Sequence, residues 1–132
     1  MTAADAQRLG EILGSFTGVG AVYLFGSAAE DRERPNSDVD VAVVPHDAAV
    51  RARRVEMLTE LARAGFDRVD LVCLDGTDAV LRFHAVRRNR LLFRAPGFDH
   101  PGYFARALRE YFDLEPLLRA RHAAYRRRVL GG

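Results

Sequence analysis

Two aspartates stand two residues apart where an apolar run begins. Asp38 immediately precedes the run VDVAVV (39–44), and Asp40 interrupts it. Side chains alternate between the two faces of a β-strand, so both carboxylates point to one side while the valines at 39, 41 and 43 point to the other. The two Cα atoms are then about 7 Å apart, from two residues at roughly 3.3 Å each. Carboxylates held this close raise each other's pKa or require a cation.

A divalent metal ion is the simplest cation for such a pair. Carboxylate oxygens favour Mg²⁺ or Mn²⁺, and Mg²⁺ typically takes one or two carboxylates together with phosphate oxygens. Asp70 breaks the apolar run RVDLVCL (68–74) in the same way. If that run is a strand beside the one with Asp40, Asp70 completes a three-carboxylate cluster. Otherwise Asp70 pairs with Arg68 or faces solvent.

Gly26 and Ser27 follow a third apolar run, AVYLF (21–25). Glycine lets the backbone approach a phosphate closely, and a serine at a helix N-terminus offers a hydroxyl and an amide to an anion. A Gly-Ser pair alone usually marks a turn, and Asp-Val-Asp alone usually marks a strand edge. Their occurrence together with Asp70 on three successive apolar runs predicts a metal-bound phosphate.

The segments around these residues predict alternating helices and strands. Strands are expected at 21–25, 39–44 and 68–74, with a short edge strand at 91–93. Helices are expected from Thr2 to about 14, from Asp47 to about 64, from about 78 to 88, and from Asp99 onward. Pro116 is expected to kink or interrupt the last helix. The predicted class is α+β, an α/β sandwich with a small mixed sheet of three to four strands flanked by helices, and a long C-terminal helix.

Length and composition favour a soluble, single domain over residues 1–132. The one cysteine, Cys73, excludes a disulfide framework and a cysteine-based metal cage. No apolar stretch approaches the roughly 20 residues that span a bilayer, and the first residues do not resemble a signal peptide. We therefore expect a cytoplasmic protein with no membrane partner.

All 20 basic residues are arginines, although the net charge is only +2. They gather in RARR (51–54), RRNR (87–90) and YRRR (125–128). These clusters are either solvated helix faces or contacts to phosphates or a partner, because guanidinium groups pair bidentately with oxyanions. Nucleic acid is not an expected partner, since no basic stripe is interleaved with aromatic residues.

The spacing of these motifs resembles a known family. Gly26-Ser27, ten further residues and Asp38-Val39-Asp40 resemble the G-S-x10-D-x-D signature of the nucleotidyltransferase superfamily that includes DNA polymerase β. The short chain is similar to the minimal nucleotidyltransferases. The tail FARALREYFDLEPLLRARHAAY (104–125) resembles the MntA-type antitoxins that pair with HEPN toxins.

The resemblance implies a nucleotidyltransferase fold and a set of functional residues. The implied catalytic and metal-binding residues are Asp38, Asp40 and Asp70, and the implied nucleotide-binding residues are Gly26, Ser27 and Ser37. Two Mg²⁺ ions, or Mn²⁺ in their place, would bridge the triphosphate of ATP, while Ser27 holds the outer phosphates and Asp70 helps to activate the incoming hydroxyl. In the antitoxins that hydroxyl belongs to a tyrosine of the HEPN ribonuclease toxin, which adenylylation inactivates. The helical region 98–130 is then a candidate interface for the toxin.

One segment departs from the family pattern. Many members have Ala-Arg-Gly shortly after Gly-Ser, whereas this chain has Ala29-Glu30-Asp31. Two acidic residues near a triphosphate are unfavourable unless they face outward. Arg32 and Arg34 are candidates to supply the missing positive charge.

Three other functions are compatible with parts of the sequence. One is an antitoxin that neutralises its toxin by contact alone. Another is a nucleotidyltransferase that acts on a small-molecule hydroxyl, although such enzymes usually have an added substrate-binding domain that this length does not accommodate. A weaker alternative is that the chain is itself a HEPN ribonuclease, because Arg94 and His100 fit R-x5-H with Tyr103 nearby. Pro96 and Gly97 argue against it, since they make this segment a loop rather than a helix.

Overall fold

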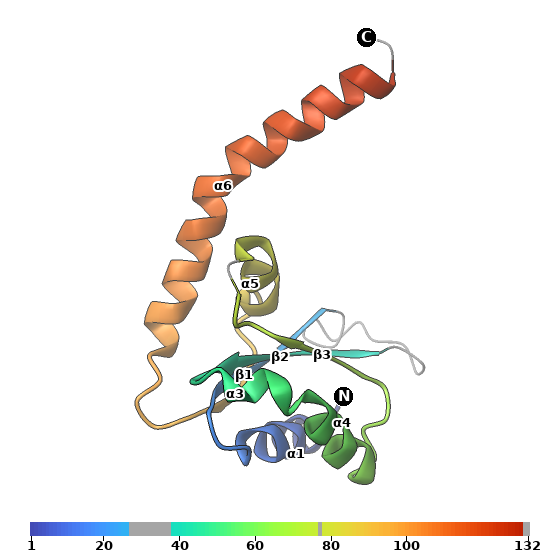
Figure 1. Ribbon diagram of the computed structural model, residues 1–132, viewed down its shortest axis with the longest axis vertical. Helices are drawn as coiled ribbons and strands as arrows, with labels where there is room; N and C mark the ends of the chain where they lie inside the picture. The colour runs from blue at the N-terminus through green and yellow to red at the C-terminus, as the bar shows by residue number, and fades with distance from the viewer. Residues whose placement is uncertain (27–37, 77, 131–132) are drawn as a thin grey trace.

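The computed structural model describes residues 1–26, 38–76 and 78–130 (Figure 1). In chain order the elements are α1 (Ala3–Gly14), β1 (Val19–Phe25), β2 (Val39–Pro45), α3 (Ala49–Ala52), α4 (Arg54–Arg63), β3 (Val69–Cys73), α5 (Ala79–Val86), β4 (Leu91–Arg94) and α6 (His100–Val129). The predicted α+β class with a mixed sheet and a long C-terminal helix is confirmed.

The strands form one four-stranded sheet in the order β3-β2-β1-β4. β2 and β3 are parallel, while β1 is antiparallel to both of its neighbours, β2 and β4. The third expected strand therefore lies beside the second, which is the condition for Asp70 to approach Asp40.

Both faces of the sheet are covered by helices, as Figure 1 shows with α1 and α4 on one side and α5 and α6 on the other. On the α1/α4 face, Val41 and Val43 of β2 pack with Leu9, Leu13 and Leu61. On the α5/α6 face, Ala42 and Val44 of β2 pack with Tyr23, Val86 and Ala107. The residues of β2 therefore alternate between two apolar layers, and Asp40 belongs to the α5/α6 face.

Several predicted boundaries differ from the structure. The helix expected from Asp47 to about 64 is two helices, because Arg53 leaves the helical conformation at φ −96°, ψ 13°. Asp47 does accept a hydrogen bond from the Ala49 amide at 2.9 Å. β1 begins at Val19, so Gly20 lies inside the strand rather than before it, next to an irregularity in the pairing with β2.

The long helix α6 begins with a side-chain cap and continues through its proline. The Gly102 amide donates to Asp99 Oδ1 at 3.0 Å, and the helix is unbroken past Pro116. In Figure 1 its axis bends midway and its C-terminal half projects away from the sheet. The expected kink is confirmed, whereas the helix is not interrupted. No helix in the described parts of the chain is long and apolar enough to cross a membrane.

The start of α6 is tied to the sheet through His100. The Tyr23 hydroxyl lies 2.8 Å from His100 Nδ1, and His100 Nε2 lies 2.8 Å from Asn89 Oδ1. These contacts join β1, α6 and the turn between α5 and β4. Because Tyr23 lies in the apolar layer beneath α6, its burial raises the pKa of its hydroxyl, which stays protonated and can donate to the imidazole. Arg94 ends strand β4 and His100 begins α6, so the two residues of the R-x5-H pattern do not share a helix, which disfavours the ribonuclease alternative.

Gly10 provides a test of how closely α1 approaches β4. A Cβ atom at position 10 would lie 2.5 Å from the Leu92 carbonyl oxygen, whereas one at Gly76 would meet open space. We expect Gly10→Ala to lower the free energy of unfolding by about 1–3 kcal/mol through overlap, even though alanine is the better helix former by about 1 kcal/mol. Urea unfolding measures this change, with Gly76→Ala as the control, and a stabilised Gly10→Ala protein would contradict the close packing.

Candidate active site

Asp40 and Asp70 occupy paired positions of the two parallel strands. The register aligns Asp40 with Asp70 and continues through Val41 with Leu71 and Ala42 with Val72. Parallel strands are roughly 4.8 Å apart and paired side chains point to the same face, so the two carboxyl groups meet on the α5/α6 face. Asp40 is half-buried and Asp70 is exposed. The predicted meeting of these two aspartates is confirmed.

Gly26 lies against the Asp40 carboxyl group. Phe25, the last residue of β1, pairs with Asp40, and Gly26 then turns at φ +69°. A Cβ atom at position 26 would overlap Asp40 Oδ2, so no larger residue fits without moving the carboxylate. The sequence predicts only that Gly26 lets a phosphate approach, and it does not predict this contact. The structure shows that it also lets the backbone pass close to an aspartate.

The surroundings of Asp40 favour its neutral form. Burial raises the pKa of the Asp40 carboxyl above its ordinary value of 3.8, and the nearby carboxyl groups of Asp70 and Asp38 raise it further. When one proton is present, Asp40 and Asp70 are close enough to share it in a hydrogen bond. A bound cation would relieve the same repulsion.

Asp38 lies near this pair and also beside an arginine. Its Oδ1 atom is 3.7 Å from Arg68 Nε, and the side chains of both residues are more than half exposed. The Val39 amide donates to the Arg68 carbonyl at 2.8 Å, which places the two residues at the same end of β2 and β3. The alternative that Arg68 pairs with Asp70 is not what the structure shows, because the guanidinium contacts Asp38.

The donor set suits a hard divalent cation, although the carboxylates do not all converge. Across residues 1–26, 38–76 and 78–130, no three His, Cys, Asp or Glu side chains are arranged to hold a metal ion together. Asp40 and Asp70 meet, while Asp38 is turned toward Arg68. Since Mg²⁺ typically uses only one or two carboxylates and completes its shell with water and phosphate oxygens, the pair Asp40–Asp70 fits such an ion.

The remaining predicted residues fall outside the described ranges. Ser27 and Ser37, predicted to bind the nucleotide, both belong to the segment 27–37. The acidic pair Glu30-Asp31 and the candidate compensating residues Arg32 and Arg34 lie in the same segment.

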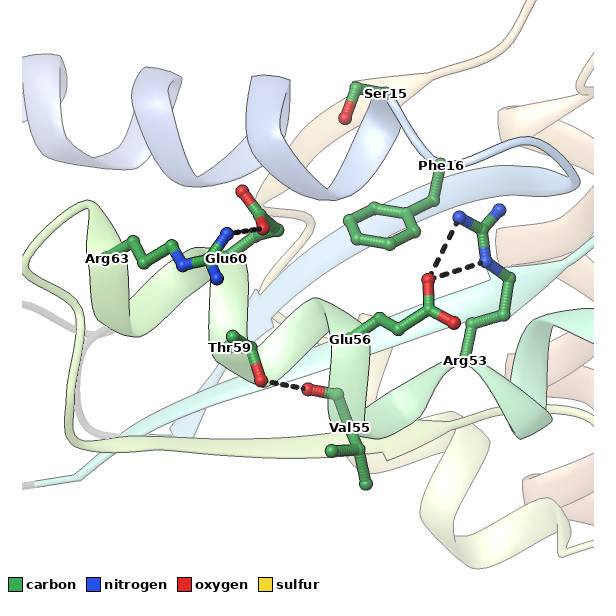
Figure 2. Close-up of a pocket in the computed structure, with 8 residues that line it drawn as sticks. All are labelled: Ser15, Phe16, Arg53, Val55, Glu56, Thr59, Glu60 and Arg63. Atoms are coloured by element: carbon green, nitrogen blue, oxygen red, sulfur yellow. Dashed lines mark hydrogen bonds and ion pairs between the residues drawn. The ribbon is translucent and has the colours of Figure 1, made fainter.

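A surface hollow elsewhere on the molecule is not the candidate site (Figure 2). It is lined by Ser15, Phe16, Arg53, Val55, Glu56, Thr59, Glu60 and Arg63. Its charged groups pair with each other, Arg53 with Glu56 at 3.2 Å and Arg63 with Glu60 at 2.9 Å. The hollow lies over the α1/α4 face of the sheet, opposite the aspartates, and has no unpaired carboxylate cluster of the kind that Asp40 and Asp70 form.

Comparison with known proteins identifies the class to which this fold and site belong. The family model described as polymerase beta, nucleotidyltransferase, matches residues 7–96, the span that contains Gly26, Asp38, Asp40 and Asp70. The chain belongs to this nucleotidyltransferase family.

One curated relative is the protein adenylyltransferase MntA of Shewanella oneidensis. The two sequences are 36% identical over 72 residues, which is 54% of this chain and 52% of that protein. The similarity therefore spans about half the length of the relative.

Two solved structures are similar over nearly the whole chain. A toxin–antitoxin structure with AMP-PNP has a TM-score of 0.75 and 25% identity, covering 92% of this chain and 97% of that one. The MNT antitoxin structure, in complex with a tri-AMPylated Shewanella oneidensis HEPN toxin, has a TM-score of 0.73 and 24% identity, covering 95% and 98%. The second likeness establishes the fold alone.

The raised pKa of Asp40 leads to a pH-dependent stability effect. The unfolded chain ionises Asp40 near 3.8, whereas the folded chain ionises it only at higher pH, so stability is lost as pH rises through this window. We expect Asp40→Asn to be more stable than the parent at pH 7, and the difference to vanish below the ordinary carboxyl pKa. Urea unfolding at several pH values measures it.

Asp113→Asn, on an exposed part of α6, is the matched control for this experiment. It should not reproduce the stabilisation at pH 7. If the Asp40→Asn protein is less stable than the parent at pH 7, the conclusion that the surroundings of Asp40 disfavour its charged form is wrong.

Proposed function

We propose that this chain is a Mg²⁺-dependent adenylyltransferase that transfers AMP from ATP to a tyrosine hydroxyl of a cognate HEPN toxin and thereby neutralises it. The observation that most supports the chemistry is the pairing of Asp40 with Asp70 beside Gly26. Membership of the nucleotidyltransferase family supports the reaction class.

The proposed reaction is an in-line displacement at the α-phosphorus of ATP. The tyrosine oxygen forms a bond to the α-phosphorus, the bond between that phosphorus and the oxygen bridging to the β-phosphate breaks, and pyrophosphate leaves with the electron pair. Asp38, Asp40 and Asp70 would hold the metal ions, with Asp38 turning from Arg68 to do so. Asp70, which is more exposed than Asp40, would also help to activate the hydroxyl by accepting its proton. Bound Mg²⁺ would supply charge stabilisation for the attacking and leaving oxygens.

Two comparisons support the acceptor and the donor. The relative in Shewanella oneidensis is named a protein adenylyltransferase. The similar structure at 25% identity is a toxin–antitoxin protein with AMP-PNP, an ATP analogue. The first supports a protein as the acceptor, and the second supports ATP as the donor.

The C-terminal half of α6 supports the proposed interface with the toxin. In this half the apolar side chains of Leu117, Tyr125 and Val129 are at least half exposed, as are those of Phe112 shortly before it and Leu130 directly after the helix. The helix projects from the body in Figure 1. Exposed apolar residues of this number on one helix are typical of a surface that binds a partner. The same surface favours the second candidate, an antitoxin that neutralises by contact alone.

Label transfer distinguishes the two candidates. The protein is incubated with α-labelled ATP, Mg²⁺ and the protein encoded by the adjacent open reading frame, which the proposal expects to be a HEPN toxin, and the label on that protein is measured. We expect transfer by the parent chain and a loss of about a thousandfold or more for the Asp38→Ala/Asp40→Ala variant, because the charge stabilisation of the transition state is removed. EDTA should also abolish transfer.

Glu11→Ala is the control for label transfer, since this exposed carboxylate lies on α1, on the opposite face of the sheet. Neutralisation of the toxin is measured with the same proteins. Two results together would contradict the enzymatic proposal and favour neutralisation by contact. The parent chain would transfer no label, and the Asp38→Ala/Asp40→Ala variant would still neutralise the toxin fully.

A further inference from the structure

Asp38 and Arg68 form a cross-strand pair just before β2 and β3 begin. The register pairs the next residues, Val39 and Val69, and both pack against the core on the α1/α4 face. Because side chains alternate along a strand, Asp38 and Arg68 both point to the α5/α6 face, the face of the candidate site. The Val39 amide donates to the Arg68 carbonyl at 2.8 Å, so the backbone holds the two residues opposite each other. Asp38 Oδ1 then lies 3.7 Å from Arg68 Nε.

The next cross-strand pair on the same face, Asp40 with Asp70, carries charges of one sign. Asp38 is near enough to this pair for its charge to raise the pKa of the Asp40 carboxyl. The Asp38 side chain therefore has two directions available, across the strands to Arg68 or along β2 towards Asp40. It faces Arg68, and the three carboxylates do not converge within the part of the chain that the structure describes.

Arg68 and a metal ion compete for the same Asp38 oxygens. A carboxylate that ligates Mg²⁺ lies about 2.1 Å from the ion, so Asp38 has to turn from the guanidinium to join Asp40 as a ligand. A guanidinium held at Asp38 also repels a divalent cation nearby. Both side chains are more than half exposed, so the ion pair is weak and the exchange of partners is reversible.

We propose that Arg68 is a positioning residue that holds Asp38 outside the empty metal site and weakens the binding of a metal ion by competing for this carboxylate. This inference rests on the proposed function, which assigns the metal ions to Asp38, Asp40 and Asp70. Phosphate oxygens are further ligands for Mg²⁺, so an ion that arrives with a nucleotide is held more tightly than the bare ion. Arg68 thus disfavours filling of the site by the bare ion.

A double-mutant cycle on Mn²⁺ binding to the full chain, without nucleotide, tests this role. Free Mn²⁺ is measured by electron paramagnetic resonance for the parent, Arg68→Gln, Asp38→Asn and the double variant. We expect Arg68→Gln to bind Mn²⁺ about twofold to fivefold more tightly than the parent, the range for loss of an exposed ion pair. In the Asp38→Asn background the same substitution should change the affinity by less than about 1.5-fold, because the competition acts through Asp38.

Arg54→Gln is the matched control for the removal of one positive charge. Arg54 Nε donates to the Leu71 carbonyl at 3.1 Å, so this guanidinium contacts the backbone of β3 rather than Asp38. The control should leave the affinity for Mn²⁺ unchanged. Thermal unfolding checks that every variant is folded.

Asp40→Asn separates failure of the proposed function from failure of the inference. If neither the parent nor Arg68→Gln binds Mn²⁺, or if Asp40→Asn leaves binding unchanged, the metal site of the proposed function is wrong and the inference falls with it. If Asp40→Asn weakens binding but Arg68→Gln does not tighten it, the inference alone is wrong. Equal tightening in the parent and Asp38→Asn backgrounds also overturns the inference, since Arg68 would then act through its charge and not through Asp38.

Discussion

The central constraint in this molecule is the repulsion between Asp40 and Asp70, held side by side by the register of two parallel strands. Neither residue can move away, because the residues that alternate with them are buried. Val41 and Leu71 lie in the core of the α1/α4 face, and a shift of one residue would exchange these apolar side chains with the aspartates. Burial of one face of the sheet therefore keeps the two carboxyl groups together on the other.

The rest of the fold shapes the space around this pair. β1 ends at Phe25, opposite Asp40, so Gly26 brings the backbone against the carboxyl group. α5 and α6 pack over the centre of the same face, where Ala42 and Val44 lie, while Asp70 at the strand end stays exposed. His100 then fastens the start of α6 and the turn at Asn89 to the sheet. The proposed site, which would have to admit a nucleotide and a second protein, thus lies at the edge of a packed layer.

Local patterns in the sequence predict much of this arrangement. Strand periodicity is a local property, so the alternation in VDVAVV predicts that Asp38 and Asp40 share one face of the sheet. Asp70 interrupts the next apolar run in the same way, which indicates that it lies beside Asp40. Long-range contacts are not predictable in this way. The approach of Gly26 to Asp40 and the bond between Tyr23 and His100 depend on how strands and helices pack. The break at Arg53 was missed because the apolar spacing of 47–64 continues across it.

The most direct test of the site is a crystal structure grown with Mn²⁺ and AMP-PNP and measured for anomalous scattering. Mn²⁺ replaces Mg²⁺ at oxygen-rich sites and can be located independently of the nucleotide. We expect an anomalous peak at a metal ion coordinated by Asp40 and at least one of Asp38 and Asp70, with a phosphate oxygen as a further ligand. A nucleotide bound without metal at these aspartates, or a metal bound at another part of the molecule, would contradict it.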